Sequence, residues 1–219
     1  MWFRKLSIFK DSQQDQQWSN LVRFFVNPRF GTDTDYAEFE LDGTFKATGA
    51  ATAWNDINFS AGNLKPGGTA PTWSSIVGGL YGYVFGASTV DELHGCEEIL
   101  HDYKEGSDIT PHIHWSPLTT NTGNVRWGLE YSWVNRSAVG TATTTIYVEQ
   151  AATGVVGTHQ VISLPTISGT GKEMGSYFCC RIFRDGTHVN DTFTGGAFMP
   201  QFGIHYEKDT LGSRSVTTK

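Results

Sequence analysis

The sequence predicts an all-β fold, a β-sandwich of jelly-roll type, in a chain of 219 residues. The composition is the first reason: 25 glycines, 13% aromatic residues and only 17% charged residues are typical of short strands joined by turns. The second reason is the spacing of alternating apolar segments, which gives about nine strand candidates separated by turn signals. The length suits a single domain with a substantial core, with helix as a minor component.

The clearest strand is 125–134, in which every second residue is apolar. Successive side chains of a strand point to opposite faces, so one face of this segment is predicted to lie in the core of a two-layer sheet. A hairpin is expected where Asp42-Gly43 separates Tyr36–Leu41 from Thr44–Ala47, because Asp-Gly adopts the positive φ angles of tight turns. Further strands are expected at 93–100, 143–150, 158–164, 176–184 and 200–207.

The domain organisation follows from changes in composition along the chain. Residues 1–35 are expected to form an N-terminal docking arm, and 36–207 a single sandwich domain with a polar C-terminal tail at 208–219. Within the sandwich, 48–79 is rich in Gly, Ala, Thr, Pro and Asn and is expected to be a long irregular loop. Long loops inside compact domains tend to be functional or interfacial.

Aromatic and aliphatic side chains in the arm and the loop are candidates for a protein interface, because exposed apolar clusters usually mark contact with a partner. An arm that folds back over its own sandwich is an equally good alternative. The candidate interface residues are Trp2, Phe3, Ile8, Phe9, Trp18, Phe24, Phe25, Trp54 and Trp73.

Two histidines near the centre of the chain lie at a spacing that can bind a metal. In an extended strand His112 and His114 share one face, while Ile113 and Trp115 face the core. Gly106, five further residues and then the two histidines match the opening of the first cupin motif, in which imidazoles hold a metal ion. The positions where that motif needs a glutamate hold Leu118 and Thr119, so the match fails at the third ligand.

His205 is the candidate for a further metal ligand from a late strand. Without a carboxylate in place, structural or surface histidines are favoured over a metal site, and no cofactor is expected. Three roles remain open if the histidines are functional: a metal on a symmetry axis, an interface weakened by protonation below about pH 6.5, or contact with a sugar. The sequence contains no nucleophile elbow, phosphate loop or dinucleotide fingerprint, so no enzyme is expected.

The formal net charge of −6 argues against nucleic acid or anionic lipid as a partner, since both need a concentrated positive patch. There is no run of about 18 apolar residues, so no membrane span is predicted. Cys96 and the adjacent pair Cys179-Cys180 do not form an even disulfide framework. We therefore expect free thiols in a protein folded in a reducing cytoplasm.

A segment of the chain resembles a known family. The run from His101 to Trp115, HDYKEGSDITPHIHW, followed by WGLEYSW at 127–133, is similar to a Lys-Glu-Gly-x-Asp-Ile-x-Pro-His-x-His-Trp pattern in virion proteins of tailed bacteriophages and prophages. The resemblance covers about residues 50–135. It implies a sandwich or jelly-roll module of the phage head surface or tail, and it supplies no catalytic residues.

The expected function is therefore that of a structural virion protein, a capsid decoration (cement) or head-spike protein that attaches through its arm and loop. The expected partners are copies of the chain itself, with a trimer as the expected stoichiometry, and the major capsid or tail proteins. Two alternatives belong to other classes: a tail-associated receptor- or carbohydrate-binding module, and a metal-dependent cupin-like enzyme that uses His112, His114 and His205.

Overall fold

The computed structural model describes residues 26–76, 79–140 and 142–219, and its regular structure is almost entirely β. The elements are β1 (Arg29–Gly31), β2 (Tyr36–Phe39), β3 (Phe45–Thr48), the 3-10 turn η1 (Gly49–Ala51), β4 (Ala53–Ser60), the 3-10 turn η2 (Ala61–Asn63), β5 (Lys65–Pro66), β6 (Thr72–Ser75), β7 (Tyr81–Phe85), β8 (Val90–Glu98), β9 (Ile109–Pro117), β10 (Asn124–Val134), β11 (Thr144–Ala151), β12 (Gln160–Ser163), β13 (Tyr177–Asp185) and β14 (Ala197–Lys208).

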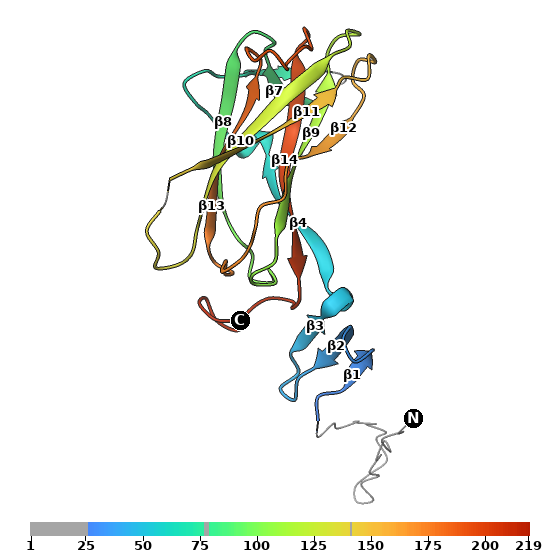
Figure 1. Ribbon diagram of the computed structural model, residues 1–219, viewed down its shortest axis with the longest axis vertical. Coiled ribbons are helices and arrows are strands. Elements are labelled where there is room, and N and C mark those ends of the chain that lie inside the picture. Colours follow the sequence, from blue (N-terminus) through green and yellow to red (C-terminus); the bar gives the residue numbers. More distant parts are fainter. Residues whose placement is uncertain (1–25, 77–78, 141) are drawn as a thin grey trace, which may run out of the picture.

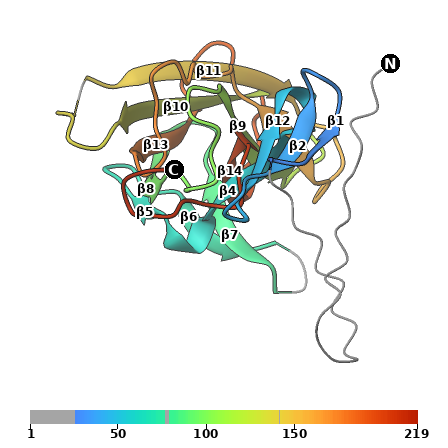
Figure 2. The same cartoon turned by 90° about the horizontal axis from the view of Figure 1, so that it is seen from below.

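Two antiparallel sheets form the main body of the molecule (Figures 1 and 2). One has the order β11-β10-β13-β8-β5, and the other has the order β12-β9-β14-β7-β6, with β4 also paired to β14. From β7 to β10, and again from β11 to β14, consecutive strands alternate between the two sheets. This connectivity is that of a jelly-roll-like sandwich, so the predicted fold class is confirmed.

The core lies between the two sheets and is built from the alternating residues that the sequence indicated. Val125, Trp127 and Leu129 of β10 are buried, and Ile113 and Trp115 of β9 face them from the other sheet. The rings of Trp115 and Trp127 meet edge to face, with centroids 6.3 Å apart. Aromatic pairs in this arrangement add stability beyond the area that they bury.

One end of the core contains a buried ion pair. Arg184 of β13 donates from Nε and Nη2 to the carboxylate of Asp191, at 2.8 and 2.7 Å. Both side chains are fully buried, and Arg184 also donates to the carbonyl oxygens of Phe85 and Gly195. The Nε, Nη1 and Nη2 atoms of Arg184 all donate hydrogen bonds, so the charge of this side chain is tolerated in the core.

The first three strands form a separate small sheet in the order β1-β2-β3, which lies beyond one end of the sandwich (Figure 1). The predicted hairpin is confirmed as β2 and β3, with Gly43 at φ +90° in the connecting turn. The free edge of β3 contacts the C-terminal segment, where the Ala47 amide donates to the Asp209 carbonyl and Lys46 bridges to Thr210. The small sheet is thus attached to the sandwich at both β4 and the C-terminal segment.

Two of the predicted domain and loop assignments differ from the structure. The sandwich begins at β4, because the hairpin expected at its start belongs to the small sheet. Residues 48–79, expected to be irregular, contain η1, β4, η2, β5 and β6 in their described part. These strands are short or polar. β4 and β5 form because β14 and β8, farther along the chain, supply backbone partners, and β6 pairs with the next strand, β7.

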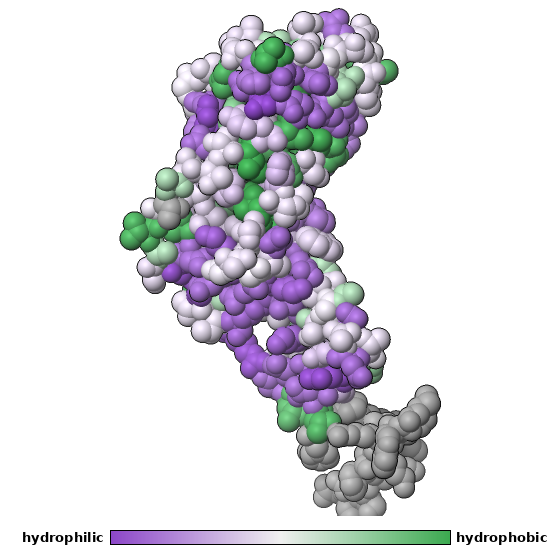
Figure 3. Space-filling view, viewed as in Figure 1, coloured by the Kyte–Doolittle hydropathy of each residue, from purple (hydrophilic) through white to green (hydrophobic). Residues whose placement is uncertain are grey.

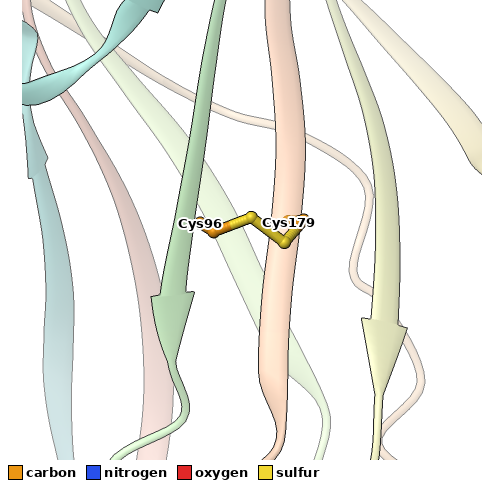
Figure 4. Close-up of a disulfide and its surroundings, with 2 residues drawn as sticks. All are labelled: Cys96 and Cys179. Atoms are coloured by element: carbon orange, nitrogen blue, oxygen red, sulfur yellow. A yellow bond between two sulfur atoms is a disulfide. The ribbon is translucent and has the colours of Figure 1, made fainter. Parts of the chain in front are cut away.

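The expectation of free thiols is wrong for two of the three cysteines. Cys96 of β8 and Cys179 of β13 lie opposite each other in the sheet and form a disulfide (Figure 4). The neighbours Cys179 and Cys180 do point to opposite faces, as the strand period requires. Cys180 is a free thiol buried in the core, where burial raises the pKa of its thiol to about 12.

In the described part of the chain, no helix has the length and apolar character needed to cross a membrane.

Candidate functional site

The two central histidines lie on the outer face of the β12-β9-β14 sheet, away from the core. The alternation along β9 buries Ile113 and Trp115 and turns His112 and His114 outward, as predicted. Gly203 of β14 faces His112 across the strand pair. A Cβ atom at position 203 would lie 2.6 Å from two atoms of the His112 ring, so the glycine makes room for the imidazole to lie over β14.

Four imidazoles form a continuous row across this face. His159 precedes β12, and its Nε2 lies 2.8 Å from Nδ1 of His114, with the two rings stacked. The ring centroids of His114 and His112 are 5.1 Å apart, and those of His112 and His205 are 6.4 Å apart. Burial, together with the nearby His112 and His159, lowers the pKa of His114. This side chain therefore favours its neutral form.

The row ends at β4. His205 Nδ1 lies 2.7 Å from a carboxylate oxygen of Asp56, and the His205 ring stacks on the indole of Trp54 with centroids 4.9 Å apart and planes 2° from parallel. β4 pairs with β14 along eight residues, which sets Trp54 opposite Glu207 and Asp56 opposite His205. Trp54 is 54% exposed, although one face of its ring is covered.

The structure brings the three predicted metal candidates, His112, His114 and His205, onto one face of adjacent strands. They are arranged in a line, with the ring-to-ring contacts given above. Among the described residues, no group of three or more His, Cys, Asp or Glu side chains is placed to hold a metal ion. The row is therefore a set of imidazoles that contact one another and Asp56.

A hollow of about 520 Å³ lies next to the end of the row. It is lined by Trp54, by the loop residues Lys104, Glu105, Gly106, Ser107 and Asp108, and by Glu207. One aromatic wall thus faces a rim of charged side chains and backbone. The hollow is therefore lined mostly by polar residues, with a single aromatic surface.

The polar rim is held together by contacts across the hollow. Lys104 Nζ lies 2.9 Å from a carboxylate oxygen of Glu207, and the Lys104 amide donates to the Glu207 carbonyl. Burial opposes ionisation of Glu207, but hydrogen bonds from Thr52 and Lys104 outweigh it and hold the pKa of this carboxyl below its usual value. Glu207 is therefore a charged acceptor at neutral pH.

The loop on the other side of the hollow is braced by its own hydrogen bonds. Gly106 has φ +82°, a conformation that favours glycine, and its amide donates to the Lys172 carbonyl. Asp108 accepts from the Gly169 amide at 3.0 Å, and Glu105 accepts from the Met174 amide at 3.2 Å. These hydrogen bonds hold the backbone of the rim in place without a ligand.

Tyr103 lies behind this loop, and the carboxylates that line the hollow affect its pKa. Its hydroxyl donates to the Ser107 carbonyl, and the residue is fully buried. Burial raises the pKa of Tyr103 to about 12, and the negative charges of Asp108, Glu105 and Glu207 act in the same direction. The carboxylates of the rim therefore concentrate negative potential at one place.

A second aromatic cluster lies on β6 and β7, which extend the sheet from the same side of β14 as β4. Trp73 of β6 is 47% exposed, and its ring is 6.1 Å from that of Tyr81 and 5.0 Å from that of Tyr83. The predicted interface residues Trp54 and Trp73 are thus both exposed, but they belong to different clusters. The other seven, Trp2, Phe3, Ile8, Phe9, Trp18, Phe24 and Phe25, lie outside the described residues.

Sequence analysis missed His159 and the rim of the hollow. His159 follows a glycine-rich turn and has no partner in its own segment, so only the pairing of β12 with β9 brings it to His114. The loop 104–108 reads as a simple turn, and only the pairing of β4 with β14 sets Trp54 beside it. In the sequence, the charged residues Lys104, Glu105 and Asp108 around Gly106 were the one signal that could have indicated the rim of the hollow.

No protein-family model matches the chain, and a comparison with curated proteins finds no significant match. Among solved structures, the CBM36-1 domain of a multidomain xylanase from the hindgut metagenome of Trinervitermes trinervoides is 14% identical, with a TM-score of 0.39, over 68% of this chain and 96% of that chain. A family 35 carbohydrate-binding module from an environmental isolate is 10% identical, with a TM-score of 0.40, over 68% of this chain and 91% of that chain.

A structure of infectious bursal disease virus, strain Gt, is 7% identical, with a TM-score of 0.30, over 84% of this chain and 50% of that chain. At these low scores and identities, none of the three likenesses transfers a function to this chain.

Proposed function

We propose that the chain is a non-catalytic binding module whose ligand is a carbohydrate, held in the hollow beside Trp54. The observation that carries the proposal is the combination of an exposed indole with a pre-arranged polar rim. A pyranose ring has an apolar C–H face and a periphery of hydroxyl groups. It can therefore stack on an aromatic ring while its edge exchanges hydrogen bonds with charged side chains.

The contacts of Trp54 favour such a ligand. The indole is fixed in orientation because His205 stacks on it and β14 pairs with its strand, so a ligand would meet a rigid surface. Glu207, the cross-strand neighbour of Trp54, and Lys104 supply an acceptor and a donor, and Glu105 and Asp108 add carboxylates. A ligand with several hydroxyl groups matches this mixture better than a purely apolar one.

The first test is a glycan array probed with the full chain, followed by calorimetric titration of the best glycan. Trp54→Ala is expected to weaken binding at least tenfold, as loss of a central aromatic anchor does at many interfaces. Trp73→Ala is the matched control, since Trp73 is an exposed tryptophan of the same sheet that belongs to a separate aromatic cluster. It should leave the affinity unchanged.

Two outcomes would contradict the proposal. One is the absence of binding to any glycan on the array, and the other is equal loss of affinity in the Trp54 and Trp73 variants. The non-catalytic part is checked separately, by recovering the bound glycan after long incubation. Conversion of the glycan to a shorter product would show that the chain is an enzyme.

The small sheet favours a second function, attachment as a structural protein of a phage virion. Phe30, Phe39 and Phe45 share one face of that sheet by register, and Phe30 is 62% exposed. In Figure 3 this part of the surface is mainly hydrophilic, with a small hydrophobic cluster at the end that lies farthest from the sandwich. An exposed apolar face on so small a sheet is typical of a contact surface. The resemblance of residues 101–115 to phage virion proteins supports the same role.

In this second proposal the chain assembles with copies of itself, as a trimer, and binds major capsid or tail proteins through residues 1–35 and the small sheet. The carbohydrate proposal fits a position on the tail, where a module of this kind would contact the host surface. Size-exclusion chromatography with light scattering tests the assembly. A trimer that becomes a monomer in Phe30→Ser/Phe39→Ser supports it, whereas a wild-type monomer at all concentrations would refute it.

A further inference from the structure

The outer face of the five-stranded sheet holds a disulfide at the floor of a second hollow, of about 390 Å³. The hollow is lined by Cys96 and Cys179, by the charged residues Lys65, Arg181 and Glu130, and by further residues that include the backbone neighbour Cys180. Cys96 is exposed and Cys179 is partly exposed. An external molecule can therefore reach the sulfur atoms without prior unfolding.

We propose that Cys96–Cys179 is a thiol–disulfide exchange site that reacts reversibly with low-molecular-weight anionic thiols of the glutathione class. The disulfide lies across two strands that are already paired, and β8 and β13 keep nine residue pairs in register. Opening the bond therefore leaves the backbone ladder in place. Exposed disulfides are the ones that exchange readily, whereas structural ones in cores resist reduction.

One charge at the hollow, that of Lys65, favours an anionic thiol. Lys65 of β5 lies opposite His94 of β8, and it makes no ion pair with any other described residue. Its ammonium group is thus available both to attract the thiolate and to stabilise a thiolate that leaves. Arg181 is different, because Glu92 and Glu130 already bind it.

The exchange proceeds in two balanced steps. The external thiolate attacks Sγ of Cys96, the more exposed partner, and forms a mixed disulfide with it while Cys179 leaves as a thiolate. A second external thiolate then attacks the outer sulfur of that mixed disulfide, which releases Cys96 as a thiolate and the oxidised external disulfide. Overall, two thiols are oxidised, the protein disulfide is reduced, and the two protein thiolates take up the protons.

Cys180 does not take part in this chemistry. It is buried, and its pKa is raised to about 12 by burial, so it holds its proton and is shielded from solvent. It also points to the opposite face of β13 from Cys179. Cys180 therefore serves as an internal control for any labelling of native protein.

The test uses the full chain under native conditions, with reduced glutathione followed by N-ethylmaleimide and mass spectrometry. We expect no label before reduction, two labels per chain on Cys96 and Cys179 afterwards, and none on Cys180. The circular dichroism spectrum should remain that of a β protein. Addition of oxidised glutathione should restore the disulfide and abolish labelling.

A charge variant tests the role of Lys65. Lys65→Gln should slow reduction by glutathione several-fold but leave reduction by neutral 2-mercaptoethanol almost unchanged. Lys46→Gln, on the small sheet, should change neither rate. Equal rates for Lys65→Gln and wild type with glutathione would refute the role of the charge.

Three results would overturn the proposal as a whole. The first is labelling of Cys96 and Cys179 in protein that has met no reductant, since the disulfide would then not form. The second is protection of the bond from glutathione until denaturant is added. The third is loss of the β spectrum on reduction, because exchange would then require unfolding.

Discussion

The outer faces of the two sheets differ in how their polar side chains are used. On the five-stranded sheet, Arg181 lies between Glu92 and Glu130, and Arg126 lies between Glu149 and Asp185. Each of these arginines is thus bound by carboxylates from neighbouring strands. The charges on this face neutralise one another, and cross-strand pairs of this kind stabilise a sheet.

The face of the other sheet has a different composition. Its central strands present His112, His114 and His205, and its β4 edge presents the exposed Trp54. The imidazoles contact one another, and among the described contacts Asp56 is the carboxylate that pairs with His205. Stacked imidazole rings and an exposed indole form fewer ion pairs than the arginines of the other face, so this face retains the capacity to bind something else.

The comparison separates residues that stabilise the sandwich from residues that are available for a ligand. Substitutions on the five-stranded face should mainly change the free energy of unfolding. Substitutions on the histidine face should leave that free energy almost unchanged and alter binding or the response to pH.

The largest expected effect is on the five-stranded face. Cys96→Ser/Cys179→Ser removes a link between residues 83 positions apart in the sequence. Closing a loop of this size stabilises a protein by about 2–4 kcal/mol, chiefly by restricting the unfolded chain. Urea unfolding should show a loss of this size with the native spectrum retained. An unchanged midpoint would mean that the bond adds no stability to the sheet.

Removal of one cation from the same face should have a smaller effect. In Arg181→Gln, Glu92 and Glu130 lose their shared partner, and the expected cost is about 1 kcal/mol, because these ion pairs are partly exposed to solvent. His112→Gln on the opposite face is the control, with an expected change of less than about 0.5 kcal/mol. Equal effects of the two variants would remove the distinction between the faces.

Gly203→Ala tests the packing of the histidine row. The new Cβ would lie 2.6 Å from the His112 ring, so either the ring or the strand must move, at a cost of about 1 kcal/mol. In Gly203→Ala/His112→Ala the obstructing ring is absent, and most of the lost stability should return. A double variant as unstable as Gly203→Ala alone would place the strain in the backbone instead.

The smallest effect is a pH dependence that arises from His114. Its folded-state pKa is lowered, first by burial and then by His112 and His159, below the ordinary value of 6.5. The unfolded chain therefore binds the proton more readily, and the stabilisation is complete above that value and declines as the pH falls toward the folded-state pKa. The melting temperature should decrease between about pH 7.5 and 5.5.

His114→Gln is the matched variant for this pH effect and should have the flatter profile. The carboxyls with lowered pKa values, Glu92 and Glu130, titrate at lower pH and should not contribute in this window. Identical profiles for wild type and variant would assign the pH response to other groups.

Local patterns in the sequence were sufficient for part of the fold. The alternation of Val125, Trp127 and Leu129, and of Ile113 and Trp115 with the histidines, identifies both the strands and their buried faces. Asp42-Gly43 identifies the hairpin because its turn conformation is a local property. These predictions depend on residues within one segment, so no partner had to be known.

The features that were missed depend on pairing between distant segments. β4 contains Asn55, Asp56 and Asn58, which are poor strand formers, and it is a strand because β14 pairs with it. The disulfide requires the register of β8 and β13, which no spacing in the sequence reveals. The hollow beside Trp54 likewise exists only after β4 and the loop 104–108 have met.

The position of β14 in the sheet has a consequence for synthesis of the protein. This strand, Ala197–Lys208, is close to the C-terminus, yet β9 pairs with one of its sides while β7 and β4 pair with the other. A ribosome makes β4, β7 and β9 long before their common partner emerges. The edges of these strands that face β14 therefore stay unpaired until it is made, and the six-stranded sheet closes only after β14 has been translated.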